Sequence, residues 1–276
     1  MQRWIQHMIQ LQDLIFAREQ QQASMQVARM SALDASIEAM ERDLPDEIRS
    51  HFQKIYKRGT LAIVPIANGV CSACGMAIPI SQVHAVHAAE KIYTCPNCAR
   101  FLFYQTSAPR RLASQRRRGE PAQVGLARFS SPRLMIPQLS ATDRDGVLAE
   151  MSARLEAEGF VDNAGRLAEE AVKREVIAST AVDPGLAFPH VRGVEGGGLT
   201  LVLGISRKGV KFGGRTLSRI IFFMVIPTAA SAFYLKLLSG LTRSFRDESA
   251  RDLLLKARTP DELWKALTKA TRSTVP

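Results

Sequence analysis

The sequence predicts a multidomain chain with an α-helical N-terminal segment of coiled-coil character, a small cysteine-containing β module and a C-terminal α/β domain. Apolar residues recur at helical spacing near the N-terminus, four cysteines form two matched pairs, and helical patterns alternate with apolar strands after residue 142. A length of 276 residues fits more than one domain. We expect a helical segment at 1–58, the cysteine module at 59–106, a linker at 107–129 and the α/β domain at 130–276.

Two apolar stripes predict helices at the N-terminus. Trp4, Met8, Leu11 and Ile15 recur at steps of four, three and four residues, which places them on one face of a helix. A second stripe follows the polar stretch at 19–24, and the two stripes together fit either an antiparallel helical hairpin or one long helix with a break. The second stripe consists of Met30, Leu33, Ile37, Met40 and Leu44.

A third helix and a strand follow these stripes. Pro45 opens the helix at a position where its missing N–H group costs no hydrogen bond, and Gly59 ends it. The apolar residues from Leu61 to Pro65 then predict a short strand. The apolar face of the third helix consists of Ile48, Phe52 and Ile55.

The segment from Ser107 to Gln123 is rich in Pro, Ser, Gln and Arg, which indicates a linker. The chain has a net charge of +11, and residues 107–142 carry seven basic residues against one acidic residue. More than half of the positive excess therefore lies in and beside the linker. A basic folded face is not required, although a basic linker can still contact polyanions.

We expect trypsin to cut the native protein first between Arg110 and Arg118, because this arginine-rich segment shows neither helix nor strand periodicity. Mass spectrometry of the earliest fragments locates the cut. A first cut inside the apolar strands predicted at 200–225 would contradict the proposed division into domains.

Helical and strand patterns alternate in the C-terminal part of the chain, which predicts an α/β domain. The segment shows no internal repeat with the N-terminal part. Helices are expected at 147–158, 165–176, 230–245, 248–256 and after Pro260, and strands at 200–205 and 220–225.

The apolar runs of the chain are too short for a membrane-spanning helix, which needs roughly 18–20 residues. The longest run, from Ile220 to Ala230, contains Pro227 and is expected to form a buried strand. The N-terminus interleaves Gln and Asp with its apolar residues and lacks the apolar centre of a secretory signal. The sequence therefore predicts a cytoplasmic protein without a membrane span.

The four cysteines fall in one pattern, in which Cys71-x2-Cys74 is followed after twenty residues by Cys95-x2-Cys98. Two thiolates at this spacing can bind one metal ion, and two such pairs complete the tetrahedron that Zn²⁺ prefers. Disulfides do not fit a reducing cytoplasm, and a redox C-x-x-C motif does not explain two matched pairs. We therefore expect one structural zinc ion on these four residues.

The surroundings of the cysteine pairs indicate the kind of module. The runs 61–79 and 94–104, which contain the pairs, resemble the bacterial C4-type zinc-ribbon proteins with an N-terminal coiled coil. The resemblance covers about residues 1–104, with a shorter coiled coil here, and implies a module that binds protein or nucleic acid around a structural zinc. His84 and His87 lie between the pairs, but four thiolates make them unnecessary as ligands and leave no open position for catalysis.

His190 follows Pro189 at the end of a short apolar segment, where a lone histidine is more often structural than catalytic. However, the segment from Arg174 to His190 resembles the phosphorylation-site motif of the type 2 enzyme IIA domains, the fructose, mannitol and nitrogen-regulatory branch of the bacterial phosphotransferase system (PTS). The resemblance extends over about residues 130–275 and implies a mixed sheet flanked by helices. The positions that fit the motif are Arg174, Glu175, Ser179, Thr180, Gly185, Ala187, Pro189 and His190.

The resemblance implies that a phosphohistidine carrier protein (HPr-like) transfers a phosphoryl group to His190, which passes it to an acceptor. A neutral imidazole can attack phosphorus near pH 7 because the pKa of histidine is about 6.5. Arg174 matches the active-site arginine of the family, and its planar guanidinium suits bidentate binding of phosphoryl oxygens.

Two parts of the sequence depart from the family pattern. The family's Gly-Ile-Gly-Asn stretch is replaced by the residues from Ala181 to Pro184, and Asp183 is expected to add a carboxylate near the anionic intermediate. Tyr234 stands where many members have a second histidine. A phenol can donate a hydrogen bond to a phosphate, but it cannot act as a cation.

Three functions fit these observations. In the first, the protein is a regulatory PTS phosphocarrier that accepts a phosphoryl group on His190. The phosphorylated state then alters what the zinc-ribbon module binds, and the expected partner is an unknown regulatory protein. In the second, the enzyme IIA-like fold is a non-catalytic adaptor that binds protein or nucleic-acid partners. The departures from the family pattern at Asp183 and Tyr234 favour this function. In the third, the ribbon and the basic linker bind nucleic acid, and retention on DNA or RNA should then fall steeply with salt.

Overall fold

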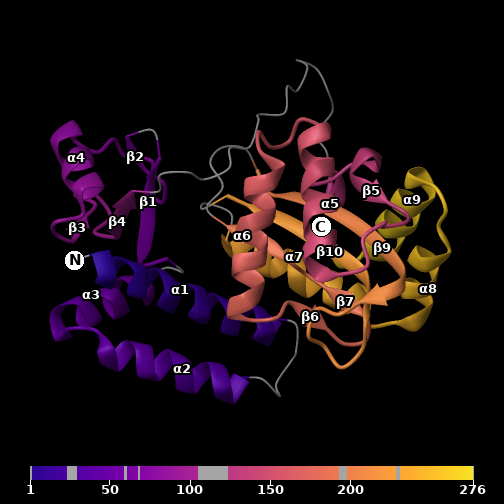
Figure 1. Cartoon of the computed structure of the whole chain (residues 1–276), viewed down its shortest axis with the longest axis horizontal. Coiled ribbons are helices and arrows are strands. Elements are labelled where there is room, and N and C mark those ends of the chain that lie inside the picture. Colours follow the sequence, from indigo (N-terminus) through magenta and orange to yellow (C-terminus); the bar gives the residue numbers. More distant parts are fainter. Residues whose placement is uncertain are drawn as a thin grey trace. The chain divides into compact units, whose positions relative to one another are not determined.

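The computed structural model describes residues 2–23, 30–58, 61–67, 69–104, 124–192, 198–227 and 231–275. The chain divides into two compact units, Met1–Ala108 and Pro109–Pro276, which Figure 1 shows in indigo to magenta and in pink to yellow. Most of the predicted linker, at 107–123, and the predicted helix end at Gly59 lie outside the described residues. None of the helices in the described part of the chain has the length and apolar content needed to cross a bilayer.

The N-terminal unit begins with three helices, and the first two form an antiparallel hairpin. His7 Nε2 lies 2.8 Å from the carbonyl oxygen of Met40, and Arg18 Nη1 donates to Asp34 Oδ1 at 3.5 Å, so opposite ends of the two helices meet. Of the two arrangements that the sequence allowed, the hairpin is the one observed. The helices are α1 (Gln2–Ala23), α2 (Met30–Asp43) and α3 (Asp46–Tyr56).

A four-stranded sheet follows, with strand order β2-β1-β4-β3. Strands β1 and β4 are parallel, and the other two pairs are antiparallel. The helix α4 between β2 and β3 was not predicted, because Val86 is its one buried residue and no apolar stripe marks it. The elements are β1 (Ile63–Ala67), β2 (Val70–Cys71), α4 (Ile80–Ala88), β3 (Tyr93–Thr94) and β4 (Phe101–Tyr104).

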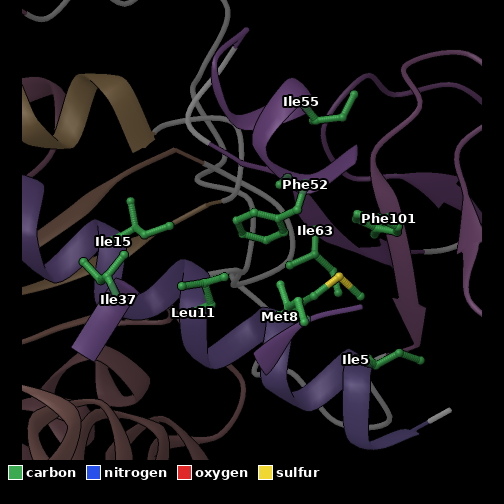
Figure 2. Packing of buried hydrophobic residues seen from close by; sticks show 11 residues of the cluster. Ile5, Met8, Leu11, Ile15, Ile37, Phe52, Ile55, Ile63 and Phe101 are labelled. Carbon is green, nitrogen blue, oxygen red and sulfur yellow. The ribbon is translucent and has the colours of Figure 1, made fainter. Parts of the chain in front are cut away.

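The helices and this sheet share one hydrophobic core (Figure 2), in which Met8 and Leu11 of α1 pack with Phe52 of α3 and with Ile63 and Phe101 of the sheet. The side chain of Gln12 adds polar links between α1 and the sheet. Its Nε2 donates to the carbonyl of Ile63 at 2.9 Å, and its Oε1 accepts from the backbone N–H groups of Ala62 and Ile63. The apolar faces predicted for the helices are thus buried against the strands as well as against each other.

The C-terminal unit is built on a six-stranded mixed sheet of order β5-β9-β10-β7-β6, with β8 also paired to β10. The central strands β9 and β10 pair antiparallel, and β7 and β8 both run parallel to β10. β9 extends well beyond the strand predicted at 200–205. The strands are β5 (Met135–Ile136), β6 (Ala181–Val182), β7 (Leu186–Ala187), β8 (His190–Arg192), β9 (Thr200–Val210) and β10 (Ser218–Ile226).

Helices cover both faces of this sheet. Nearly every residue of β10 is buried, which requires cover on both sides. In Figure 1, α5 and α6 lie in front of the sheet and α7 lies behind it. All five helices lie within a few residues of their predicted bounds. They are α5 (Arg144–Ala157), α6 (Ala164–Ile177), α7 (Ser231–Ser244), α8 (Glu248–Lys256) and α9 (Pro260–Thr271).

Side-chain caps determine where several of these helices begin. Asp143 accepts a hydrogen bond from the N–H of Gly146 at 2.9 Å, so α5 starts three residues before the predicted start at residue 147.

Two short 3-10 turns precede α5, namely η2 (Gly125–Arg128) and η3 (Pro132–Leu134). Leu126 of η2 is buried, so the end of the predicted linker contributes an apolar residue to the C-terminal unit.

Candidate functional site

The four cysteines that the sequence paired by spacing come together in the N-terminal unit. Their Sγ atoms all lie within 4.8 Å of one another. Cys71 and Cys98 are 3.8 Å apart at sulfur, and Cys74 and Cys95 are 3.7 Å apart. Zn–S bonds of about 2.3 Å in a tetrahedron place neighbouring sulfurs about 3.8 Å apart, so the cysteines are positioned for zinc binding.

The two cysteine turns have the same backbone geometry. The carbonyl of Cys71 accepts from the N–H of Gly75 at 2.8 Å, and the carbonyl of Cys95 accepts from the N–H of Ala99 at 2.9 Å. Both donors have positive φ, +73° at Gly75 and +60° at Ala99. A side chain at this φ is unfavourable, so Ala99 occupies a position that suits glycine. The matched turns direct both sulfurs of each pair toward the same point.

The buried members of the cysteine cluster favour the neutral thiol unless a cation lies beside them. Cys71 and Cys95 are buried, and burial raises the pKa values of their thiols. A bound Zn²⁺ stabilises the thiolate form, and four thiolates close its coordination shell, as in structural zinc sites. His84 and His87 are exposed and are not part of the metal-binding cluster found among the described residues, and the ring of His87 instead packs edge-on against Tyr104.

In the C-terminal unit, His190 is the first residue of β8 and pairs with Met224 of the central strand β10. Its side chain is 1% exposed. The helix α6 packs against β8 and brings Arg174, the other candidate residue of the motif, to the histidine. The segments that continue from β8 and β10, at 193–197 and 228–230, lie outside the described residues.

The two ring nitrogens of His190 have different partners. Nδ1 lies 3.2 Å from the carbonyl oxygen of Phe188, and Nε2 accepts from Nε of Arg174 at 3.3 Å. A carbonyl oxygen can only accept a hydrogen bond and an arginine N–H can only donate one. The pair of contacts therefore assigns the proton to Nδ1 and leaves the lone pair of Nε2 facing the guanidinium.

The electrostatic environment keeps the ring neutral at pH 7. Burial lowers the pKa of His190 well below its usual range, and the positive charge of Arg174 lowers it further. Arg174 is held in place because its Nη1 donates to the carbonyl of Ala178 at 3.1 Å, just beyond the end of α6. A neutral nucleophilic nitrogen and a cation thus lie in direct contact.

The two residues that depart from the family pattern lie in different places. The Tyr234 hydroxyl of α7 lies 3.3 Å from Nδ1 of His190, so the phenol occupies the site itself. Asp183 does not. The Asp183 carboxylate accepts from the N–H groups of Arg215 and Thr216. Asp183 precedes β7, whose first residue pairs with Ile220 of β10, whereas His190 pairs with Met224. These two positions on β10 are four residues apart, roughly 13 Å along the strand. The expectation of a carboxylate near the intermediate is therefore wrong, because the turn lies at the other end of the strands.

Glu175, to which the motif assigned no role, is a further component. It is 4% exposed, and its two oxygens accept from the N–H and from the hydroxyl of Thr180, both at 2.7 Å. Burial raises the pKa of the Glu175 carboxyl to about 7, while the hydrogen bonds from Thr180 and the charges of Arg174 and Arg144 lower it. In the sequence, the signal that could have pointed to Glu175 is its position directly after Arg174 in the motif.

Two family models match the chain. One, described as the phosphoenolpyruvate-dependent sugar phosphotransferase system EIIA 2, matches residues 128–270, and the other, a C4-type zinc ribbon domain, matches residues 70–102. The two resemblances predicted from the sequence are thereby confirmed. The N-terminal unit contains a C4-type zinc ribbon with the four cysteines in place for the metal.

Similar proteins include the 2-O-α-mannosyl-D-glycerate-specific EIIABC component of Escherichia coli (strain K12), which is 30% identical over 131 residues. That match covers 46% of this chain but only 20% of the relative. The fructose-specific EIIA component of Haloferax volcanii is 27% identical, over 40% of this chain and 72% of its own length. Nitrogen regulatory protein IIA-Ntr from Neisseria meningitidis has a solved structure that matches 51% of this chain and 97% of its own, with 23% identity and a TM-score of 0.47.

Proposed function

Since the chain belongs to the EIIA 2 family of the phosphoenolpyruvate-dependent sugar phosphotransferase system, we propose that it is a regulatory phosphocarrier whose acceptor is His190. Membership of the family supports a phosphocarrier role in this system, and the assignment of the acceptor rests on the geometry. The observation that supports it best is the contact of 3.3 Å between Arg174 Nε and His190 Nε2. It places a cation beside the nitrogen that carries the lone pair, and the Arg174 N–H bonds to that lone pair when no phosphoryl group is present.

In the proposed step, the Arg174 N–H leaves the lone pair of His190 Nε2, and that lone pair attacks the phosphorus of a phosphohistidine on a carrier protein. The new N–P bond forms as the donor's N–P bond breaks, and the electron pair of the broken bond returns to the donor's imidazole. The proton on Nδ1 stays in place, held toward the carbonyl of Phe188 at 3.2 Å. No base is needed, because burial keeps the ring neutral at pH 7.

Arg174 compensates charge in this step. Phosphoryl transfer involves little covalent work by the protein, so positioning and stabilisation of the charge on the three equatorial oxygens dominate. The guanidinium lies 3.3 Å from Nε2, so after it leaves the lone pair it is within reach of these oxygens, and it offers several donors in one plane. Tyr234 contacts the opposite nitrogen without adding a second positive charge.

We propose that the zinc ribbon, with the metal on Cys71, Cys74, Cys95 and Cys98, is the module that binds a regulatory partner. The metal would hold the two turns together and supply no chemistry beyond that, since four thiolates leave no open position. A cytoplasmic location belongs to the same proposal, because the donor carrier proteins act there.

The non-catalytic adaptor is the second candidate. The specific observation that favours it is the 1% exposure of His190, because a donor has to reach Nε2 before transfer can occur. The two candidates make opposite predictions about phosphate incorporation.

We expect the purified full-length protein to gain one phosphate per chain when it is incubated with phosphoenolpyruvate and the general phosphotransferase proteins. The phosphate should be lost in acid and retained in base, as for a phosphoramidate, and ³¹P NMR or intact mass measures it. Absence of label with every competent donor would rule out the phosphocarrier and leave the adaptor.

A further inference from the structure

A continuous series of hydrogen bonds connects Glu175 to the ring of His190. The carboxylate accepts from the N–H and the hydroxyl of Thr180, both at 2.7 Å. The carbonyl of Thr180 accepts from the N–H of Phe188 at 3.0 Å, and the carbonyl of Phe188 lies 3.2 Å from Nδ1 of His190. The orientation of the histidine is therefore coupled to a carboxylate that does not touch it.

The strand register makes this series of contacts stiff. Thr180 directly precedes β6 and Phe188 directly follows β7, and these two strands pair antiparallel with Ala181 opposite Ala187. β7 and β8 are in turn paired with β10. The side chains of all four residues are buried, with exposed fractions between 0% for Phe188 and 4% for Glu175. A displacement of Thr180 must therefore move the Phe188 carbonyl.

Both oxygens of Glu175 are directed at one residue. A carboxylate that only filled space or capped its own helix would not need to bind the backbone and the side chain of Thr180 together. In addition, Arg174 is its neighbour on α6, so one turn of helix is linked to both ring nitrogens of the histidine. Arg174 contacts Nε2 directly, and Glu175 is linked to Nδ1 through Thr180 and Phe188.

We propose that Glu175 is a positioning residue for His190, which holds the Phe188 carbonyl against Nδ1 through Thr180 and so keeps the proton on Nδ1 and the lone pair on Nε2, the nitrogen that attacks the phosphoryl group. The expected effect on the phosphorylation rate rests on the proposed function. The tautomer of the His190 ring does not, because it can be measured in the unphosphorylated protein.

The test uses three substitutions in the full-length chain. Glu175→Gln keeps the shape but can accept only one of the two hydrogen bonds, and Thr180→Val removes the hydroxyl at nearly constant volume. Thr180→Ser keeps the hydroxyl and serves as the rescue. The matched control is Glu170→Gln on the same helix, because Glu170 is paired with the exposed side chain of Lys173 and not with the site.

The first readout is the ¹⁵N NMR spectrum of the histidine rings, which distinguishes a protonated Nδ1 from a protonated Nε2. We expect the wild type, Thr180→Ser and Glu170→Gln to show Nδ1–H for His190, and Glu175→Gln and Thr180→Val to show a mixture of tautomers. Because the measurement needs no phosphate, it remains informative even if the protein accepts none.

The second readout is the phosphorylation rate as a function of donor concentration. We expect Glu175→Gln and Thr180→Val to lower the saturating rate by roughly 10-fold while leaving the donor KM within about twofold, because a misplaced nucleophile affects the step and not the encounter. The proposal is overturned if both variants keep the Nδ1–H tautomer and the wild-type rate. It is equally overturned if the rate of these variants falls only in proportion to the fraction of protein that is unfolded. The same holds if Thr180→Ser, which keeps the hydroxyl, loses as much rate as Thr180→Val.

Discussion

His190→Ala should reduce phosphate incorporation from phosphoenolpyruvate and the general phosphotransferase proteins to background, since no other group in the site can form the phosphoramidate. The ring is the one histidine in the described part of the C-terminal unit, and its Nε2 has a lone pair directed at Arg174. Tyr234 is the other nucleophile in contact with it, but burial raises the pKa of the phenol and keeps it protonated. Labelling is measured by intact mass or by radiolabelled phosphoenolpyruvate.

The Arg174 variants measure the charge compensation separately. Arg174→Ala should fold and accept phosphate about 100-fold more slowly, which is the usual effect of removing one donor from a charge-stabilising site. Arg174→Lys should lie between this variant and the wild type, because it keeps the charge but loses the planar arrangement of donors. His84→Ala, an exposed histidine of the zinc-ribbon unit, is the control and should label normally.

Tyr234 provides a second control at the same ring. Tyr234→Phe removes one contact of Nδ1 but leaves the Phe188 carbonyl in place, so the rate should change by less than about threefold. Tyr234→His should be neutral or faster, because it restores a group that can carry positive charge. If His190→Ala labels as the wild type does, the acceptor has been assigned to the wrong residue, although the family still stands.

Replacement of Cys95 and Cys98 together by serine should remove the zinc and unfold the N-terminal unit. The native protein should contain one zinc per chain by metal analysis, because the sulfur separations of 3.7 and 3.8 Å fit a tetrahedral ion. Structural zinc contributes apparent binding free energies of about 10–16 kcal/mol in zinc-finger peptides, more than the core of a small module can replace.

The loss should spread through the whole N-terminal unit, because Ile63 and Phe101 of the ribbon share a core with α1 and α3 (Figure 2). Calorimetry should lose the transition of that unit while the transition of the C-terminal unit remains. His84→Ser with His87→Ser is the matched control and should keep the metal, since neither side chain belongs to the cysteine cluster. Full retention of zinc in the cysteine variant, or less than half an equivalent in native protein, would rule out the site.

The parts of this protein that follow from the sequence alone are those whose signal is local. Helices α1 and α2 were marked by apolar steps of three and four residues, β10 by its unbroken apolar run, and the metal cluster by the spacing of Cys71, Cys74, Cys95 and Cys98. In each case neighbouring residues carry the information, and a helical turn or a cysteine turn needs no distant partner to form.

The tertiary structure decided what depends on distant segments. Glu175 reads as one more residue of a motif until the pairing of β6 with β7 brings Thr180 opposite Phe188. Likewise, Asp183 lies seven positions from His190 in the chain, but the parallel pairing of β7 and β8 with β10 places it at the far end of the strands. Strand register sets which backbone groups meet, and it is fixed only when the strands pair and bury their apolar residues in the assembled sheet.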